Sequence, residues 1–246
     1  MAEKIAVVTG GSLGLGRETA RLLLDQGYRV AIFGRSQASL DDAVADLGRG
    51  VLAVSVDVSD DASVVAGFAE VDAALGPVDT LINSAAIFRP FLVEKASASD
   101  VMAMVNTNFC GQIYCAREAI ARMRPRGGGD IINVSSESVR QSTPCFVVYA
   151  ATKAAVESFT KQMGEELRED GIRCTTFRVG RMLSPGAANA SFPPGLLERY
   201  IERSQTTGAG YWTGVGMAPA SAAQVLVNIL QTPRDARQEF VELRSA

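Results

Sequence analysis

Three residues that could move a proton stand at an informative spacing. Ser136 follows an apolar run that favours a strand, and Tyr149 and Lys153 stand four residues apart in a run that favours a helix. That spacing places both side chains on one helical face. A lysine ammonium beside a phenol favours the phenolate, so we expect Lys153 to lower the pKa of Tyr149 from about 10. Tyr149 could then act as a general acid or base, with Ser136 bonding the same substrate oxygen.

A strand and a helix must position these residues, and the same alternation recurs along the chain. Apolar runs predict the strands, and helix-favouring runs without an internal repeat predict the segments between them. We therefore expect one continuous α/β domain over residues 1–246. The expected strands are 4–9, 28–33, 51–56, 78–82, 131–134, 172–177 and 239–243, and the expected helices are 17–26, 62–75, about 97–123, 150–164 and 218–230.

A glycine-rich turn separates the first strand from the first helix. Its residues are Thr9-Gly10-Gly11-Ser12-Leu13-Gly14-Leu15-Gly16. A turn of this kind lets the backbone approach a pyrophosphate, which the helix N-terminus then stabilises. An ordinary glycine turn is the alternative. We expect dinucleotide contacts from Gly10, Ser12, Leu13, Gly14, Leu15 and Gly16.

The end of the second strand indicates which dinucleotide is bound. An NAD site usually places an acidic residue there to bond the ribose hydroxyls. This chain has Gly34, Arg35 and Ser36 instead. Glycine leaves room for a 2′-phosphate, and the arginine guanidinium can donate two hydrogen bonds to it. We therefore expect NADP(H) to bind with the help of Arg35 and Ser36. The alternative is that Arg35 is a solvated loop residue.

The pattern T-G-x-x-x-G-x-G, together with Asn108, Ser136, Tyr149 and Lys153, resembles the single-domain branch of the short-chain dehydrogenase/reductase family. The resemblance covers nearly the whole chain. It implies a doubly wound, Rossmann-like parallel sheet of about seven strands with helices on both faces. It also implies hydride transfer between a nicotinamide and a carbonyl or alcohol carbon. Asn108 would bind a relay water through its backbone, and Lys153 would bond the nicotinamide ribose.

The resemblance also implies further cofactor contacts. Asp57 and Val58 would meet the adenine, and Asn83 and Ala85 would form the turn after the fourth strand. The segment after the sixth strand departs from the family pattern P-G-x-x-x-T, with Val179 replacing the proline and Ser184 standing for the threonine. Contacts to the nicotinamide and phosphates would come from Gly180, Leu183 and Ser184.

Residues 185–216 combine glycines with large aromatic side chains, which favours a mobile lid over an apolar pocket. Phe192 and Trp212 would then contact the substrate together with Ser136 and Tyr149. A packed surface helix without substrate contact is the alternative. Arg89 and Arg140 could bind a substrate carboxylate, although pairing with Glu137 or Glu94 is the simpler expectation.

These features predict an NADP(H)-dependent oxidoreductase acting on a small apolar or aromatic ketone or secondary alcohol. A 3-oxoacyl-carrier-protein reductase-like enzyme is the alternative. The basic turn 122–129 is expected to be a solvated loop, and recruitment of an acidic carrier protein by this turn is the other interpretation. The V-D-G-G pattern that the family often has near its C-terminus is absent from this chain, and its absence argues against the carrier-protein reductase alternative. A non-catalytic NADP(H)-sensing module would have no need of Asn108, Ser136, Tyr149 and Lys153 together.

Composition limits the other function classes. The net charge is −3 and no apolar run reaches the roughly 20 residues of a membrane helix, so neither nucleic acid nor a membrane is an expected partner. We expect no signal peptide, a cytoplasmic protein and reduced thiols. The absence of histidine excludes a histidine-based triad and makes a zinc site improbable, so we expect no metal. The resemblance implies a homotetramer or homodimer.

Overall fold

The computed structural model describes residues 3–48, 50–183, 192, 195–207 and 216–246. Seven strands form one sheet in the order β3-β2-β1-β4-β5-β6-β7, and all neighbouring pairs are parallel. The chain reverses its direction of winding between β1 and β4, which confirms the predicted doubly wound sheet. The strands are β1 (Ile5–Thr9), β2 (Arg29–Gly34), β3 (Val51–Ser55), β4 (Thr80–Asn83), β5 (Gly129–Ser136), β6 (Ile172–Val179) and β7 (Phe240–Leu243).

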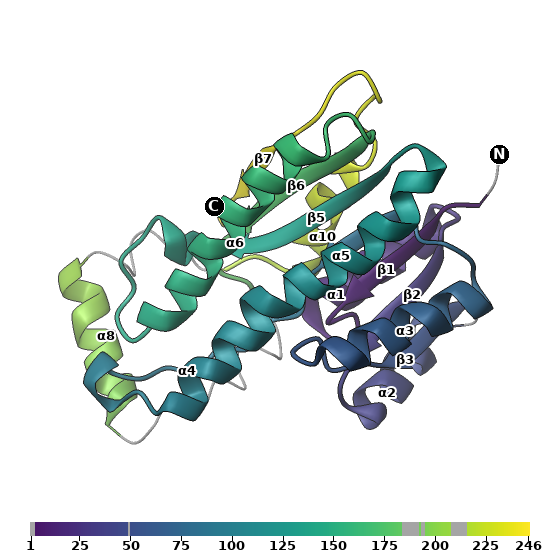
Figure 1. The fold of residues 1–246 in the computed structure, drawn as a ribbon. Coiled ribbons are helices and arrows are strands. Elements are labelled where there is room, and N and C mark those ends of the chain that lie inside the picture. The colour runs from purple at the N-terminus through teal and green to yellow at the C-terminus, as the bar shows by residue number, and fades with distance from the viewer. Residues whose placement is uncertain (1–2, 49, 184–191, 193–194, 208–215) are drawn as a thin grey trace.

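Helices cover both faces of this sheet (Figure 1). Buried side chains of α3, α5 and α6 form one apolar cluster with the sheet, and those of α1, α2 and α10 form a second cluster on the other face. The helices are α1 (Gly14–Asp25), α2 (Gln37–Leu47), α3 (Asp61–Ala74), α4 (Ala98–Val105), α5 (Gly111–Met123), α6 (Val147–Glu166), α8 (Leu196–Thr207) and α10 (Pro219–Ile229).

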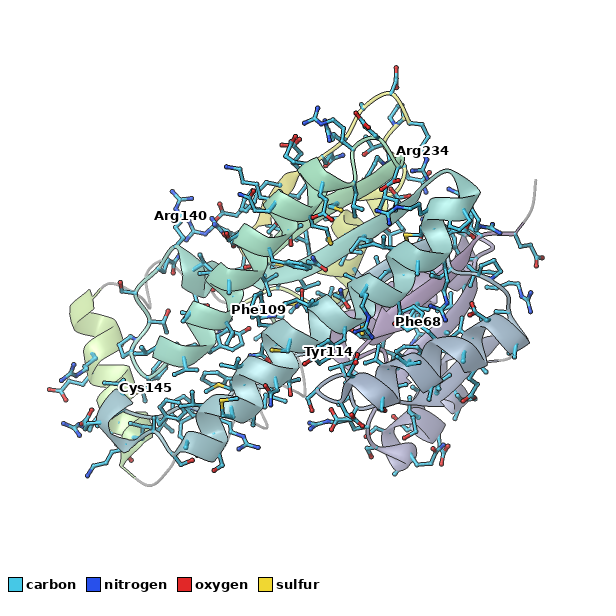
Figure 2. All side chains as sticks on the ribbon, viewed as in Figure 1. Phe68, Phe109, Tyr114, Arg140, Cys145 and Arg234 are labelled. Carbon is cyan, nitrogen blue, oxygen red and sulfur yellow. The ribbon has the colours of Figure 1, made fainter. Side chains whose placement is uncertain are left out.

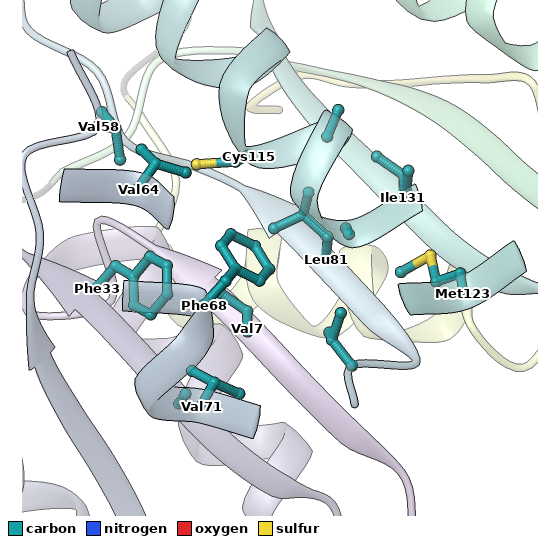
Figure 3. Packing of buried hydrophobic residues seen from close by; sticks show 14 of the residues in the cluster. Val7, Phe33, Val58, Val64, Phe68, Val71, Leu81, Cys115, Met123 and Ile131 are labelled. Carbon is teal, nitrogen blue, oxygen red and sulfur yellow. The ribbon is translucent and has the colours of Figure 1, made fainter. Parts of the chain in front are cut away.

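The strands supply side chains to both clusters because successive residues point to opposite faces. Val7, Leu81 and Ile131 from three adjacent strands pack with α3 and α5 (Figure 3). Phe33 and Phe68 add an edge-to-face ring pair with centroids 5.4 Å apart. Burial on both faces explains why the strands read as continuous apolar runs in the sequence. The core thus holds the carboxyl ends of the strands in fixed positions.

The expected helix over residues 97–123 forms, but a π-helical turn interrupts it. The side chain of Ser97 caps α4 by accepting a hydrogen bond from the Asp100 backbone N–H at 3.0 Å. The π-helical segment η2 (Asn106–Cys110) then joins α4 to α5. Single π-helical turns inside α-helices are frequent at functional sites.

Two further features bear on the sequence predictions. The four cysteines are free thiols, and Cys115, Cys145 and Cys174 are buried, as expected for reduced core residues. Within the described part of the chain, no helix combines the length and apolar character that a membrane crossing would need.

Candidate active site

Ser136, Tyr149 and Lys153 come together at the carboxyl end of β5. Ser136 is the last residue of β5, and Tyr149 and Lys153 lie in the first turns of α6. The intervening chain begins with the 3₁₀ turn η4 (Glu137–Val139) and returns to the sheet as α6, so that the Ser136 side chain comes close enough to the Tyr149 phenol to influence its pKa. The arrangement places a hydroxyl and a phenol where one substrate oxygen could contact both.

The side chain of Lys153, one helical turn after Tyr149 in α6, is buried and only 1% exposed. Its Nζ donates a hydrogen bond to the Val134 carbonyl oxygen at 2.9 Å. Burial disfavours the ammonium form and lowers the pKa of Lys153 from 10.5 to about 8. The Nζ atom is 5.8 Å from the centroid of the Tyr149 ring.

The pKa of Tyr149 differs from the sequence expectation. Burial raises this pKa above 10.0, and a hydrogen bond from Ser136 acts in the opposite direction. The prediction that Lys153 lowers the pKa is therefore wrong for this structure, because the Lys153 ammonium bonds the backbone of β5. A raised pKa keeps the phenol protonated at neutral pH, which suits a proton donor.

Asn108 lies in the π-helical turn and is fully buried. Its Oδ1 accepts from the Ile87 backbone N–H at 2.8 Å, and its Nδ2 donates to the Ile87 carbonyl oxygen at 2.9 Å and to Thr152 Oγ1 at 3.3 Å. Thr152 in turn donates to the Tyr149 carbonyl oxygen at 2.7 Å. The Asn108 side chain thus joins three segments of the site. With that side chain occupied, a water contact would fall to the Asn108 backbone, as the resemblance implies.

The turn between β1 and α1 has the close backbone contacts of a pyrophosphate cradle. Gly10 has a φ of +66°, and a Cβ there would lie 2.9 Å from the Ala85 Cα. A Cβ on Gly16 would lie 2.3 Å from the Gly10 carbonyl oxygen. Leu13 precedes α1 without a side-chain cap, which leaves N–H groups of the first turn for an anion. These residues fit a nicotinamide dinucleotide.

The other three predicted residues of this turn could contact such a ligand in different ways. Leu15 is buried, so its backbone is the part available for a contact. Gly14 takes a positive φ of +52°. Ser12 is also buried, and its Oγ would lie 3.2 Å from a Cβ built on Gly34. Ser12 therefore links the glycine-rich turn to the end of β2.

The end of β2 presents a basic side chain. Arg35 is exposed and makes no hydrogen bond or ion pair with another described residue. Ser36 caps α2, a helix that the sequence reading did not identify, by accepting from the Ser39 backbone N–H at 3.3 Å. Arg35 is therefore available to an anionic ligand at the N-terminal end of α2.

The residues expected near the adenine lie in the loop after β3. Asp57 Oδ1 accepts from the Ser59 backbone N–H at 2.9 Å and from Ser59 Oγ at 2.7 Å. This local turn holds the Asp57 carboxylate in a defined direction. Val58 is 6% exposed, and its carbonyl oxygen lies against Gly111 of α5.

The turn after β4 is fixed differently from the expectation. Asn83 is buried, and its Nδ2 donates to the Gln112 carbonyl oxygen at 3.2 Å and to Asn133 Oδ1 at 2.9 Å. Its side chain therefore joins β4 to β5 and α5. The turn is held instead by Thr9, whose Oγ1 accepts from the backbone N–H groups of Ser84 and Ala85, both at 3.0 Å.

The segment after β6 is held by the C-terminal part of the chain. The Gly180 backbone N–H donates to the Leu243 carbonyl oxygen at 2.8 Å, and a Cβ on Gly180 would lie 2.9 Å from Glu137 Oε2. Leu183 is 61% exposed. Ser184, the next predicted contact, lies outside the described residues, as does Trp212.

Aromatic rings surround Tyr149. The Phe88 and Phe146 rings stack with centroids 4.2 Å apart, and they lie 5.4 and 6.0 Å from the Tyr149 ring. Phe192 and Tyr200 extend the group, with the Tyr200 ring 5.9 Å from Phe146 and 5.2 Å from Phe192. Sequence reasoning singled out Phe192 but not Phe88 or Phe146. Their positions just after β4 and just before Tyr149 were the available signal.

Tyr200 belongs to α8, so residues 196–207 of the segment expected to form a lid are helical. The remainder of the expected lid lies outside the described residues, apart from Phe192, Gly195 and Gly216. The two arginines considered for a substrate carboxylate have partners within the chain. Arg89 pairs with Asp100 and Arg140 with Glu242, rather than with Glu94 or Glu137.

The fold and this site define a dinucleotide-binding enzyme, and comparison with known proteins gives its family. Residues 4–192 match the family described as short chain dehydrogenase, and the chain belongs to that family. Its members that resemble this chain are oxidoreductases, so the chain is an enzyme that uses a nicotinamide cofactor and acts on C=O or CH–OH groups of small molecules.

Three similar proteins illustrate the range of this family. An uncharacterized oxidoreductase, YgfF, from Escherichia coli is 36% identical over 204 residues, covering 79% of this chain and 82% of the relative. A 3-oxoacyl-[acyl-carrier-protein] reductase from Bos taurus is 30% identical, covering 94% and 92%. A crystal structure of actinorhodin polyketide ketoreductase with NADPH superposes with a TM-score of 0.86 at 25% identity, covering 98% and 96%.

Proposed function

We propose that this enzyme is an NADP(H)-dependent reductase of a small ketone whose carbonyl carries an apolar or aromatic group, and that it also catalyses the reverse oxidation. The observation that carries the proposal is the group of rings around Tyr149. Phe88 and Phe146 lie within 6.0 Å of the phenol ring. An aromatic or apolar substituent beside the reacting carbonyl would gain contact area and ring stacking there.

The residues divide the chemistry between them. Bound nicotinamide would supply or accept the hydride. Ser136 and Tyr149 would hold the carbonyl oxygen, and the Tyr149 phenol would give its proton to that oxygen as charge develops on it. Lys153 would hold the nicotinamide ribose, and Asn108 would support a water that returns the proton to Tyr149.

Arg35 supports the choice of NADP(H). It is exposed and lacks an acidic partner within the described residues, and a glycine stands where an acid would repel a 2′-phosphate. The actinorhodin ketoreductase carries NADPH in its crystal structure, which agrees with this choice.

A 3-oxoacyl-carrier-protein reductase is the second candidate, favoured by the Bos taurus relative. An acidic carrier protein would need free basic side chains. The basic turn that could recruit one is neutralised within the chain, because Arg122, Arg124 and Arg126 pair with aspartates at 2.8, 2.8 and 2.9 Å. We therefore favour a free small-molecule substrate.

NADPH consumption over a panel of ketones separates these candidates. The panel should include aliphatic, aryl and 3-oxoacyl thioester compounds, each assayed with NADPH and NADH. We expect the highest kcat/KM with aryl or branched apolar ketones and NADPH. Turnover confined to the 3-oxoacyl thioesters would favour the second candidate, and no turnover with any compound would contradict the proposal.

A further inference from the structure

A nearly buried ion pair, Arg178–Glu157, joins β6 to α6, the helix that carries Tyr149 and Lys153. Arg178 of β6 donates from Nε to Glu157 Oε1 at 2.8 Å and from Nη2 to Glu157 Oε2 at 2.6 Å. The two side chains are only 14% and 15% exposed. A bidentate pair of this kind fixes direction as well as distance, because both groups are planar. It therefore sets how α6 lies against β6.

Ser135 joins this pair to the strand that carries Ser136. Its hydroxyl donates to Glu157 Oε1 at 2.7 Å and lies 3.4 Å from the Lys153 carbonyl oxygen. The parallel register places Ser135 beside Arg178, so both side chains face α6. Ser135, Arg178 and Glu157 thus connect two strands and the catalytic helix at one point.

The pair belongs to a seam of polar contacts between α6 and β5. Lys153, Glu157 and Thr160 lie on one face of α6. Lys153 bonds the β5 backbone, Glu157 receives the Ser135 hydroxyl, and Thr160 accepts from Asn133 Nδ2 at 2.8 Å. Satisfied buried polar contacts specify one arrangement more strictly than apolar packing does. They define both the rotation of α6 and its position along its own axis.

We propose that Glu157 and Arg178 are positioning residues that set the separation of Ser136 and Tyr149. Ser136 follows Ser135 directly in β5, and Tyr149 precedes Glu157 by two helical turns, so a shift at the pair moves both groups. This inference rests on the proposed function, in which both groups hold one carbonyl oxygen. A displacement of about 1 Å can lower turnover about 100-fold without loss of the fold.

The test replaces Arg178 by methionine and compares the variant with a matched control. Arg173 forms a similar pair with Asp130, at 2.7 Å and with side chains 12% and 7% exposed, across the same two strands. That pair lies at their opposite end. Arg234, which also pairs with Asp130, lies far from Arg140 in Figure 2. Arg173→Met should therefore disturb stability without disturbing the active site.

For Arg178→Met we expect kcat to fall about 10- to 100-fold, while KM for NADPH changes less than about threefold. The pH midpoint of kcat should rise, because a weaker bond from Ser136 lowers the Tyr149 pKa less. Arg178→Lys, which keeps the charge and one bond, should recover part of kcat. Arg173→Met should keep kcat within about twofold and leave the midpoint unchanged. Equal kcat losses in both methionine variants would overturn the proposal.

A double variant separates positioning from stability. Glu157→Leu with Arg178→Leu removes both charges of the pair and leaves Glu242, which also contacts Arg178, with its second partner Arg140. The melting temperature of this double variant should therefore return toward that of the wild type. Its kcat should remain low because the directional contacts are gone. Recovery of kcat together with stability would show that the pair is merely structural, and would overturn the proposal.

Hydrogen exchange tests the same inference without any substrate. Backbone amides of residues 149–153 should exchange faster in Arg178→Met than in Arg173→Met under native conditions. Unchanged exchange would contradict the positioning role, whether or not the wild type reduces ketones. Absence of ketone reduction by the wild type would instead contradict the proposed function.

Discussion

Tyr149 is the residue on which the proposed chemistry depends. Tyr149→Phe removes the proton donor but retains the ring that contacts Phe88 and Phe146. We expect kcat to fall at least about 100-fold, with little change in NADPH affinity. Stopped-flow turnover and fluorescence titration of NADPH measure the two quantities separately. Turnover close to that of the wild type would show that another group donates the proton.

Lys153 illustrates a conflict between function and stability. Its ammonium is buried, and its pKa is lowered to about 8 from 10.5. Below pH 8 both folded and unfolded states carry the charge, and the folded state bears the full cost of burying it. Lys153→Met should therefore increase the free energy of unfolding at pH 7 by roughly 1–3 kcal/mol, while abolishing most activity.

The pH dependence gives this prediction its sign. Between pH 8 and 10.5 the folded wild type has released a proton that the unfolded chain retains, so wild-type stability rises with pH in this window. The difference in free energy of unfolding between Lys153→Met and the wild type should therefore become smaller as the pH rises through this window. Urea unfolding of both proteins at pH 7 and pH 10 measures the difference. A wild type more stable than the variant at pH 7 would mean that the bond to Val134 outweighs the burial cost.

Arg35 tests the choice of cofactor. Charge-assisted bonds to a phosphate contribute about 1.5–3 kcal/mol, or roughly 10- to 150-fold in affinity. Arg35→Ala should therefore lower kcat/KM for NADPH at least tenfold and leave NADH nearly unchanged. The control is Arg117→Ala, an exposed arginine that pairs with Asp61 on another face. A wild type that prefers NADH would contradict the NADP(H) assignment.

The complementary change at Gly34 is less simple than the sequence alone indicates. A carboxylate there would favour NADH by accepting from its ribose hydroxyls. The structure shows that a Cβ at Gly34 would lie 3.1 Å from a Leu40 methyl group and 3.2 Å from Ser12 Oγ. These side chains must shift by a few tenths of an ångström. Sequence spacing identifies the position but does not reveal this crowding.

At the scale of elements, the strands and most helices were predictable because both faces of the sheet are buried. Continuous apolar runs such as 5–9 and 131–134 had few other interpretations. The π-helical turn was not predictable, because 106–110 has no distinguishing pattern of its own. The helix α2 was also missed, although Ser36 provides its N-terminal cap. Its apolar positions are few, with Leu40 and Ala43 buried, so its periodicity is weak.

Two loops supply the rings that define the proposed pocket. Phe88 follows β4 and Phe146 precedes α6, and their rings stack at 4.2 Å. Phe88→Ala removes this pair and the contact with Tyr149. We expect KM for apolar ketones to rise roughly 2- to 12-fold, with KM for NADPH unchanged. Steady-state kinetics with one aryl and one small aliphatic ketone measures the effect, and equal changes for both ketones would contradict an aromatic-binding role.

At the scale of the whole molecule, the doubly wound topology explains why distant residues meet. Thr9 bonds the backbone after β4, and Glu157 bonds a side chain of β6. Such contacts depend on strand order and register, which single-sequence patterns do not encode. The candidate catalytic residues could be named from the sequence because a family pattern carries them. The Glu157–Arg178 pair was not, since an acid and an arginine twenty-one residues apart carry no local signal.

The same topology leaves one face of the molecule with aromatic side chains that the core does not fully cover. Phe109 and Phe159 pack edge-to-face with centroids 6.3 Å apart, where η2 meets α6. Tyr114 of α5 and Phe159 are both partly buried against the apolar cluster that α3, α5 and α6 form with the sheet. Figure 2 labels Phe109 and Tyr114 close to each other, where η2 continues into α5. A second copy of the chain packed on α5 and α6 would bury these rings.

We therefore expect a homotetramer, or at least a homodimer, that uses this face. Light scattering at micromolar concentration should give a multiple of the 26.0 kDa chain mass. Tyr114→Glu would bury a charge in the interface and should shift the mass toward a single chain. Val44→Glu on α2 is the control, because Val44 is already 36% exposed and α2 packs on the opposite face of the sheet from α5 and α6. A wild type with the mass of one chain would refute the assembly, and dissociation by Val44→Glu alone would place the interface on α2.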